Sequence, residues 1–133
     1  MDGVFVNDGI MHHLAAKILV IDDVALNLSI VADMLADNGY SNVLTLQNAA
    51  EAFELIETER PELIILDLMM PVVSGFDILT QLRDHPKHKY LPVIVLTAAT
   101  DNENKLKALS LGASDFLSKP FDKLELCIRV RTL

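Results

Sequence analysis

Five polar residues of this sequence each follow a segment rich in apolar residues, and their types suit phosphoryl chemistry. They are Asp22, Asp23, Asp67, Thr97 and Lys119. Carboxylates that share a small site disfavour each other's ionisation, and a divalent cation removes that conflict. Because the acidic ligands offer only oxygen atoms, the expected ion is a hard one, Mg²⁺.

Asp67 is the expected nucleophile of such a site. A carboxylate beside Mg²⁺ can attack a phosphoryl group and form an aspartyl phosphate. Since phosphoryl transfer passes through a loose transition state, catalysis depends mainly on positioning and on charge neutralisation. Lys119 would bring a cation to the phosphoryl oxygens, Thr97 would donate a hydroxyl hydrogen bond, and the small Ala98 would leave room for the incoming group.

Taken singly, each of these residues also has an ordinary structural explanation. Asp22 and Asp23 could cap a helix, Thr97 is a common strand residue, and Lys119 could be a solvated loop charge. Asp67 could simply open a polar loop. Whether these residues form one site therefore depends on whether the helices and strands that carry them bring them together.

Strands and helices alternate along the chain. Apolar segments predict strands at 17–23, 43–46, 63–66, 92–97 and 114–118. Helical spacing of apolar residues predicts helices that begin after Asp23, at Ala49, at Ser74 or Gly75, at Asp101 and at Asp122. Asp23 is the expected N-cap of the first helix, and the last helix is expected to bury Leu124, Cys127 and Ile128.

Five strand–helix alternations with short connections predict an α/β fold. The expected architecture is flavodoxin-like, a doubly wound five-stranded parallel sheet in the order 2-1-3-4-5 with helices on both faces. The first, third and fourth strands are the most apolar, so they should be central. In this order the five polar residues all reach the same edge of the sheet, beside the point where the strand order reverses.

The length of 133 residues suits one domain, and 51% hydrophobic residues suffice for a packed core. Residues 1–16 show no clear period and are expected to form a poorly ordered N-terminal extension, with the domain over residues 17–133. The adjacent His12 and His13 in that extension have no third ligand nearby and are expected to be solvated. Residues 129–133 look like a helix cut short, as if an output domain followed.

The charge and the cysteine content exclude several classes of function. A net charge of −8 argues against direct binding of nucleic acid, which needs a basic face. The single Cys127 cannot form an internal disulfide. No apolar run approaches the roughly 20 residues of a membrane helix, and the first residues lack the pattern of a secretory signal. These features predict a cytoplasmic protein without a membrane segment.

The motifs together resemble the receiver domain of bacterial two-component response regulators over residues 17–133. They are the pair Asp22-Asp23, the run Asp67-x-x-Met70-Pro71-x-x-x-Gly75, the pair Thr97-Ala98 and the run Lys119-Pro120-Phe121. The resemblance implies that Asp67 accepts phosphate from a histidine of a sensor kinase or of a phosphotransfer protein. It implies a regulatory domain, not an enzyme for another substrate, that controls an output domain or a partner protein.

The resemblance also assigns roles around Asp67. Asp23, Asp67 and the backbone carbonyl of Met69 would hold Mg²⁺, and Asp22 would act through a water molecule. After phosphorylation Thr97 would move towards the phosphoryl group and Phe116 would turn inward.

Further features follow from the same resemblance. The Lys119–Pro120 bond is expected to be cis, and a homodimer would form through the last two helices. Met69 and Ala99 are apolar where many relatives carry polar groups, which leaves the lifetime of the phosphorylated state open. Phe116 stands where many relatives have tyrosine.

Two other classes remain as alternatives. A haloacid-dehalogenase-like phosphatase also uses a Mg²⁺-bound aspartate, but its nucleophile ends the first strand. A receiver-like interaction module would signal without phosphate, but such modules typically lack part of the acidic and basic set. His85 and His88 lie in the polar loop 84–89 and are poor candidates for a phosphorelay histidine, which lies on a bundle helix.

Overall fold

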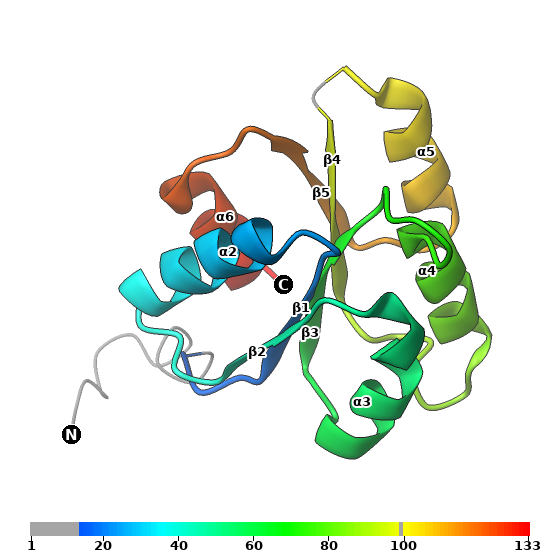
Figure 1. The fold of residues 1–133 in the computed structure, drawn as a ribbon, viewed down its shortest axis with the longest axis horizontal. Coiled ribbons are helices and arrows are strands. Elements are labelled where there is room, and N and C mark those ends of the chain that lie inside the picture. Colours follow the sequence, from blue (N-terminus) through cyan, green and yellow to red (C-terminus); the bar gives the residue numbers. More distant parts are fainter. Residues whose placement is uncertain (1–13, 99) are drawn as a thin grey trace.

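The computed structural model describes residues 14–98 and 100–133, and Figure 1 shows a central sheet with helices on both faces. The strands are β1 (Ile18–Ile21), β2 (Val43–Leu46), β3 (Leu63–Asp67), β4 (Val93–Ala98) and β5 (Asp115–Lys119). All pairings are parallel, and the strand order is β2-β1-β3-β4-β5. The predicted flavodoxin-like order is therefore confirmed. Of the predicted N-terminal extension, only residues 14–16 belong to the described part.

The helices divide between the two faces of the sheet (Figure 1). They are α2 (Ala25–Asp37), a short 3₁₀ turn η1 (Ala49–Glu51) that leads into α3 (Ala52–Glu59), α4 (Gly75–Asp84), α5 (Asn102–Ser110) and α6 (Lys123–Arg131). Helices α2 and α6 pack on one face, and α3, α4 and α5 pack on the other. None of the described helices is long and apolar enough to cross a membrane.

Burial on both faces explains the uninterrupted apolar runs of the central strands. Successive side chains of β3 point to opposite faces. Ile64 and Leu66 join the core under α3, α4 and α5, whereas Leu63 and Ile65 join the core under α2 and α6. β2 lies at an edge of the sheet and is only partly buried, as its more polar sequence predicts.

Three helices begin where the sequence predicts, and a polar side chain caps each of them. Ser74 forms a capping box with Asp77, and the side chains of Asp101 and Asp122 cap α5 and α6. The prediction for Asp23 is wrong. The N-cap of α2 is Val24, no side chain caps the helix, and the backbone N–H of Val24 itself donates to Asp22 Oδ1 at 3.0 Å.

The predicted buried face of α6 is wrong in part. Cys127 is buried as expected, but Leu124 and Ile128 are 64% and 43% exposed. Leu126 and Val130 take their place in the core. Apolar residues surround much of this short helix, so its period alone could not choose the face that the sheet covers.

Gly75 allows the start of α4 to approach the end of β3. A Cβ atom at this position would lie 2.5 Å from the backbone oxygen of Asp67 and 2.7 Å from Cα of Leu68. The N–H of Gly75 donates to the backbone oxygen of Leu68 at 3.0 Å. The loop after Asp67 is therefore held against the helix by a contact that tolerates no side chain.

Gly75→Ala is expected to lower the free energy of unfolding by about 1–3 kcal/mol, because the added methyl group must displace backbone atoms. Urea denaturation of the two proteins measures the difference. Thr80→Ala, at an exposed position of the same helix, is the control and should stay within about 0.5 kcal/mol. Equal stability of the Gly75→Ala variant and the wild type would contradict the close approach.

Candidate functional site

The predicted site residues meet at the carboxyl edge of the sheet. Asp22 directly follows β1, Asp67 is the last residue of β3, and Lys119 is the last residue of β5. Thr97 lies in β4 next to Leu96, which pairs in register with Asp67, and Ala98 pairs with Lys119. The register of four parallel strands thus brings together residues that are up to 97 positions apart in the sequence.

Lys119 lies between two buried carboxylates. Its Nζ is 3.4 Å from Oδ1 of Asp67 and 3.8 Å from Oδ2 of Asp22. Asp67 is only 5% exposed and Asp22 only 1%, whereas the lysine side chain reaches solvent. One ammonium group therefore partly compensates two carboxylates that have left water.

Asp22, Asp23 and Asp67 form an acidic cluster, in which one carboxylate oxygen from each lies within 4.8 Å of the others. Oδ1 of Asp22 accepts the Val24 N–H, but its Oδ2 is buried and has no hydrogen-bond partner among the described residues. Buried polar atoms are rarely left unpaired in native proteins. Three oxygen ligands, one of them a buried oxygen without a hydrogen bond, fit a hard divalent cation such as Mg²⁺.

The pKa of Asp67 is raised above its ordinary value. Burial is the largest cause, and the negative charge of Asp22 adds to it. Lys119 opposes this rise through its charge and its hydrogen bond, and a backbone hydrogen bond from Met69 also opposes it. The environment as a whole therefore disfavours the charged carboxylate unless more positive charge is supplied.

Thr97 is buried, with 2% of its surface exposed, and no described group forms a hydrogen bond with its Oγ1. An unsatisfied hydroxyl of this kind costs about 1–3 kcal/mol. The neighbouring Ala98 is exposed, so a small residue follows Thr97 at this edge of the sheet. The hydroxyl is available to donate to a group that enters the site.

The remaining predicted residues lie around this centre. Phe116 is partly buried, and Nζ of Lys105 lies 5.2 Å from the centre of its ring. Met69 is exposed and its sulfur lies 3.8 Å from Nδ2 of Asn104. The Lys119–Pro120 bond is cis, as expected. Ala99, one of the two apolar departures, lies outside the described residues.

Two hollows of about 270 Å³ flank the acidic cluster, and their linings include residues that the sequence did not single out. One is lined by Asp23, Gln47, Pro71 and their neighbours, and the other by Asp22, Asn27, Lys119 and theirs. Gln47 donates to the backbone oxygen of Asp23 at 3.1 Å and so helps to fix that residue. Only its position after β2, at the same sheet edge, could have marked Gln47 beforehand.

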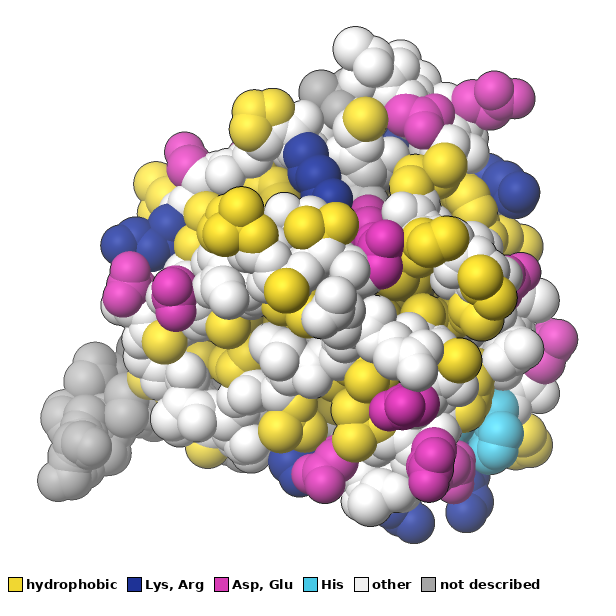
Figure 2. All heavy atoms as spheres, viewed as in Figure 1, with side chains coloured by type: hydrophobic (Ala, Val, Ile, Leu, Met, Phe, Trp, Pro, Cys, Tyr) yellow, Lys and Arg dark blue, Asp and Glu magenta, His cyan; other side chains and the backbone are white. Residues whose placement is uncertain are grey.

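Hydrophobic side chains lie close to charged ones on the face that Figure 2 shows. In the view of Figure 2, acidic and basic side chains near the middle of the face have hydrophobic side chains around them.

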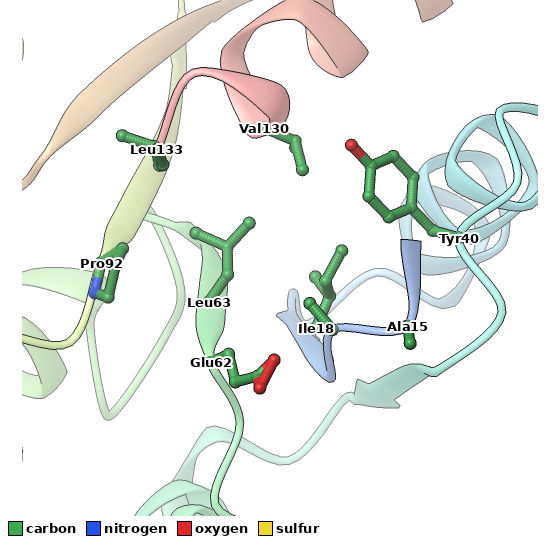
Figure 3. Close-up of a pocket in the computed structure, with 9 residues that line it drawn as sticks. Ala15, Ile18, Tyr40, Glu62, Leu63, Pro92, Val130 and Leu133 are labelled. Carbon is green, nitrogen blue, oxygen red and sulfur yellow. The ribbon is translucent and has the colours of Figure 1, made fainter. Parts of the chain in front are cut away.

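A larger hollow of about 470 Å³, drawn in Figure 3, lies between the amino ends of β1 and β3 and the end of α6, where Tyr40 and Val130 face each other. It is at the opposite edge of the sheet and takes no part in the acidic site.

A parallel sheet in this order, with an acidic cluster and a lysine at its switch point, defines the receiver class of signalling domains. The sequence model of the response regulator receiver domain matches residues 18–131. The chain belongs to this family.

The solved structures that resemble this chain are of the same kind. The chemotaxis protein CheY4 of Vibrio cholerae has a TM-score of 0.81 and 32% identity, over 89% of this chain and 98% of that one. The receiver domain of response regulator 1452 from Francisella has a TM-score of 0.78 and 35% identity, over 88% and 94% of the two chains.

Several curated relatives are longer than this chain. The response regulator PleD of Caulobacter vibrioides is 36% identical over 120 residues, which are 90% of this chain and 26% of PleD. Several other relatives are matched over about half of their length. The chain thus corresponds to the receiver part of these proteins.

Asp67→Asn is expected to raise the free energy of unfolding at neutral pH, and the gain should disappear in acid. Because the folded state raises the pKa of Asp67 above 3.8, it holds the proton more tightly than the unfolded state does. The cost of the charge is therefore absent below that ordinary value, grows as the pH rises towards the folded-state pKa, and is complete above it.

Urea denaturation from about pH 3 to pH 8 measures this linkage. Asp33→Asn, on the exposed surface of α2, is the matched control and should show no such pH-dependent gain. A gain of the same size in both variants, or a loss at neutral pH in Asp67→Asn, would contradict the assigned direction.

Proposed function

We propose that Asp67 is the phosphoacceptor of this receiver domain, and that it takes the phosphoryl group from a histidine of a sensor kinase or phosphotransfer protein. The observation that carries the proposal is the pairing of the buried Asp67 carboxylate with Lys119 at 3.4 Å, beside two further carboxylates. Burial of the Asp67 carboxylate at the end of a strand costs free energy. A role in phosphoryl transfer would explain why a carboxylate occupies this position.

The transfer requires only a few actions from this chain. An Asp67 oxygen forms the new bond to phosphorus, while the bond to the histidine nitrogen breaks and the nitrogen keeps the electron pair. Lys119 neutralises negative charge on the phosphoryl oxygens, and the unpaired hydroxyl of Thr97 donates a hydrogen bond to one of them. Positioning and neutralisation are the main contributions that such a transition state needs.

The acidic cluster would hold the Mg²⁺ ion on which the reaction depends. Asp23, Asp67 and the backbone carbonyl of Met69 are the proposed direct ligands, and Asp22 acts through water. When bound, the ion supplies positive charge that offsets the mutual repulsion of the carboxylates and of the incoming phosphoryl group. The raised pKa of Asp67 and the buried Oδ2 of Asp22, which has no hydrogen bond, support this assignment.

Phosphorylation would switch the domain through Thr97 and Phe116. A phosphoryl group adds about −1.5 to −2 charges and three strong acceptors next to the unpaired Thr97 hydroxyl. A shift of Thr97 towards these acceptors would leave space in which the partly buried ring of Phe116 can turn inward. The altered surface would control an output domain or a partner protein.

The last two helices are the proposed surface of a homodimer. Their exposed apolar residues are Leu106 and Leu109 on α5 and Leu124 and Ile128 on α6. Apolar side chains that a monomer leaves in water favour association. The exposure of Leu124 and Ile128, which corrected the predicted face of α6, supports this role.

Incubation with a small acyl phosphate and Mg²⁺ is expected to add one phosphoryl group, seen as a single mass increase of the intact protein. Chelation of the metal should prevent the increase, and Asp67→Asn should abolish it. Asp33→Asn should be modified as the wild type is. Lys119→Gln should slow the reaction by about a hundredfold, since one charge-stabilising donor is lost.

An adduct that forms equally in the Asp67→Asn variant would contradict the assignment of the phosphoacceptor. Continuous release of phosphate from unrelated phosphate esters would instead favour the aspartate-dependent phosphatase.

Thr97→Ala is expected to accept the phosphoryl group but to lose the conformational response. The NMR resonances of the Phe116 ring should change on phosphorylation of the wild type and of Thr97→Ser, which keeps the hydroxyl. In Thr97→Ala the change should be absent. The same change in all three proteins would show that the ring responds without the hydroxyl.

A further inference from the structure

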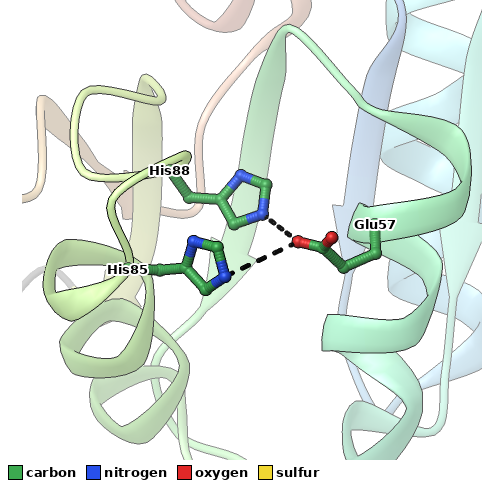
Figure 4. Close-up of side chains that lie close together, drawn as sticks. All are labelled: Glu57, His85 and His88. Atoms are coloured by element: carbon green, nitrogen blue, oxygen red, sulfur yellow. Dashed lines mark hydrogen bonds and ion pairs between the residues drawn. The ribbon is translucent and has the colours of Figure 1, made fainter.

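A second group of ligating side chains lies far from the acidic cluster. Glu57 belongs to α3, and His85 and His88 belong to the turn that follows α4 (Figure 4). The carboxyl-terminal ends of α3 and α4 lead into β3 and β4, so this group lies at the amino edge of the sheet. The phosphoryl chemistry at the opposite edge does not use it.

The three side chains converge on a single point. Nε2 of His88 lies 2.5 Å from Oε1 of Glu57, and Nε2 of His85 lies 3.9 Å from the same oxygen. One ligand atom from each of the three residues lies within 4.8 Å of the others. The imidazole rings lie side by side, with 4.6 Å between their centres.

Several interactions that do not involve these rings help to fix the backbone of the turn. The His88 N–H donates to the His85 oxygen at 3.0 Å, which closes a turn with Pro86 inside it. Arg83 donates to the His88 oxygen at 3.2 Å and, through Nε and an Nη atom, to the Gly112 oxygen at 3.0 and 2.7 Å. The two histidines therefore share one side of a held turn before any ligand arrives.

We propose that Glu57, His85 and His88 bind a zinc ion. Two imidazoles and one carboxylate form a ligand set that zinc uses, and imidazole disfavours Mg²⁺. Tetrahedral zinc with bonds of about 2.0–2.1 Å places its ligand atoms about 3.3 Å apart. The separations of 2.5 and 3.9 Å lie on either side of this value, so small rotations suffice.

The side chains that must rotate are the ones with freedom to do so. Glu57 and His85 are 44% and 38% exposed, whereas His88 is 12% exposed and anchors the group. A hollow of about 540 Å³ borders Glu57 and His88 and gives the ion's remaining coordination position access to water.

One existing hydrogen bond has to break when the ion binds. Nδ1 of His85 accepts the Lys87 N–H at 3.1 Å, so the neutral ring carries its proton on Nε2. Coordination through Nε2 moves that proton to Nδ1 and releases the Lys87 N–H to water. The exchange of one exposed hydrogen bond costs about 1 kcal/mol, well below the binding free energy of a zinc site.

Without an ion the same residues form a histidine–glutamate contact. The hydrogen bond from His88 is the main reason that the pKa of Glu57 is lowered. That contact accounts for His88, but not for the approach of His85 to the same oxygen. Bound zinc would cross-link α3 to the turn before β4 and would stabilise the amino edge of the sheet independently of the phosphorylation state.

Calorimetric titration of the full chain, stripped of metal, with zinc chloride at about pH 7.5 tests the proposal. One ion should bind with micromolar or tighter affinity. The double variant His85→Gln, His88→Gln should lose at least about tenfold in affinity, and Glu57→Gln should also bind more weakly. All three positions are at least partly exposed, and circular dichroism checks that the variants fold.

Two controls separate this site from the other ligands in the chain. His12→Gln combined with His13→Gln removes the remaining histidines, and Asp67→Asn removes a carboxylate of the acidic cluster. Both should keep the wild-type affinity for zinc. A nitrogen-15 NMR spectrum should show the proton of His85 moving from Nε2 to Nδ1 when zinc is added.

The proposal is overturned if no zinc binds at micromolar concentration, in which case the three residues form an ion pair only. It is also overturned if the His85→Gln, His88→Gln variant keeps its affinity, or if the His12→Gln, His13→Gln variant loses it.

Discussion

The structure depends on keeping the Asp67 carboxylate almost entirely out of water. β3 is buried on both faces up to its last residue, and that residue is the aspartate. Burial and the neighbouring Asp22 both disfavour the negative charge of Asp67, and the ammonium group of Lys119 partly compensates this charge at close range. The parallel register of β3, β4 and β5 is what brings the lysine within 3.4 Å of the carboxylate.

The same edge retains two buried polar atoms that the described fold leaves without a hydrogen bond. Oδ2 of Asp22 and Oγ1 of Thr97 are buried and have no hydrogen-bond partner in the described part of the chain. A sequence selected for stability alone would remove such atoms, because each one costs free energy. Their presence on both sides of Asp67 is the physical reason to expect that an ion and a phosphoryl group complete the site.

The two edges of the sheet have different chemistry because the strands are parallel. Every carboxyl end opens on one side, where the carboxylates and the lysine gather. The loops on the other side include the turn with His85 and His88, whose side chains point towards Glu57 on α3 (Figure 4). Oxygen ligands at one edge and imidazole ligands at the other would select different metal ions, so the two proposed sites need not compete.

The sequence by itself determined the strand order and most of the acidic site. The apolar runs that end at Asp22 and Asp67 identify central strands, and a parallel sheet must then bring the residues after them to one edge. These predictions rest on apolar runs of four or five residues. A strand that is buried on both faces requires such a run, so the pattern is a reliable guide. The roles of the residues in phosphoryl transfer were inferred from their chemistry and remain proposals.

Only the tertiary structure decided the features that depend on which surfaces meet. α6 has apolar residues around much of its circumference, and the sheet selected Leu126 and Val130 over Leu124 and Ile128. The carboxylate that accepts the Val24 N–H before α2 belongs to Asp22 and not to Asp23. Glu57 and His88 are 31 residues apart and share no periodic pattern, so their contact arises only when α3 packs beside the turn after α4.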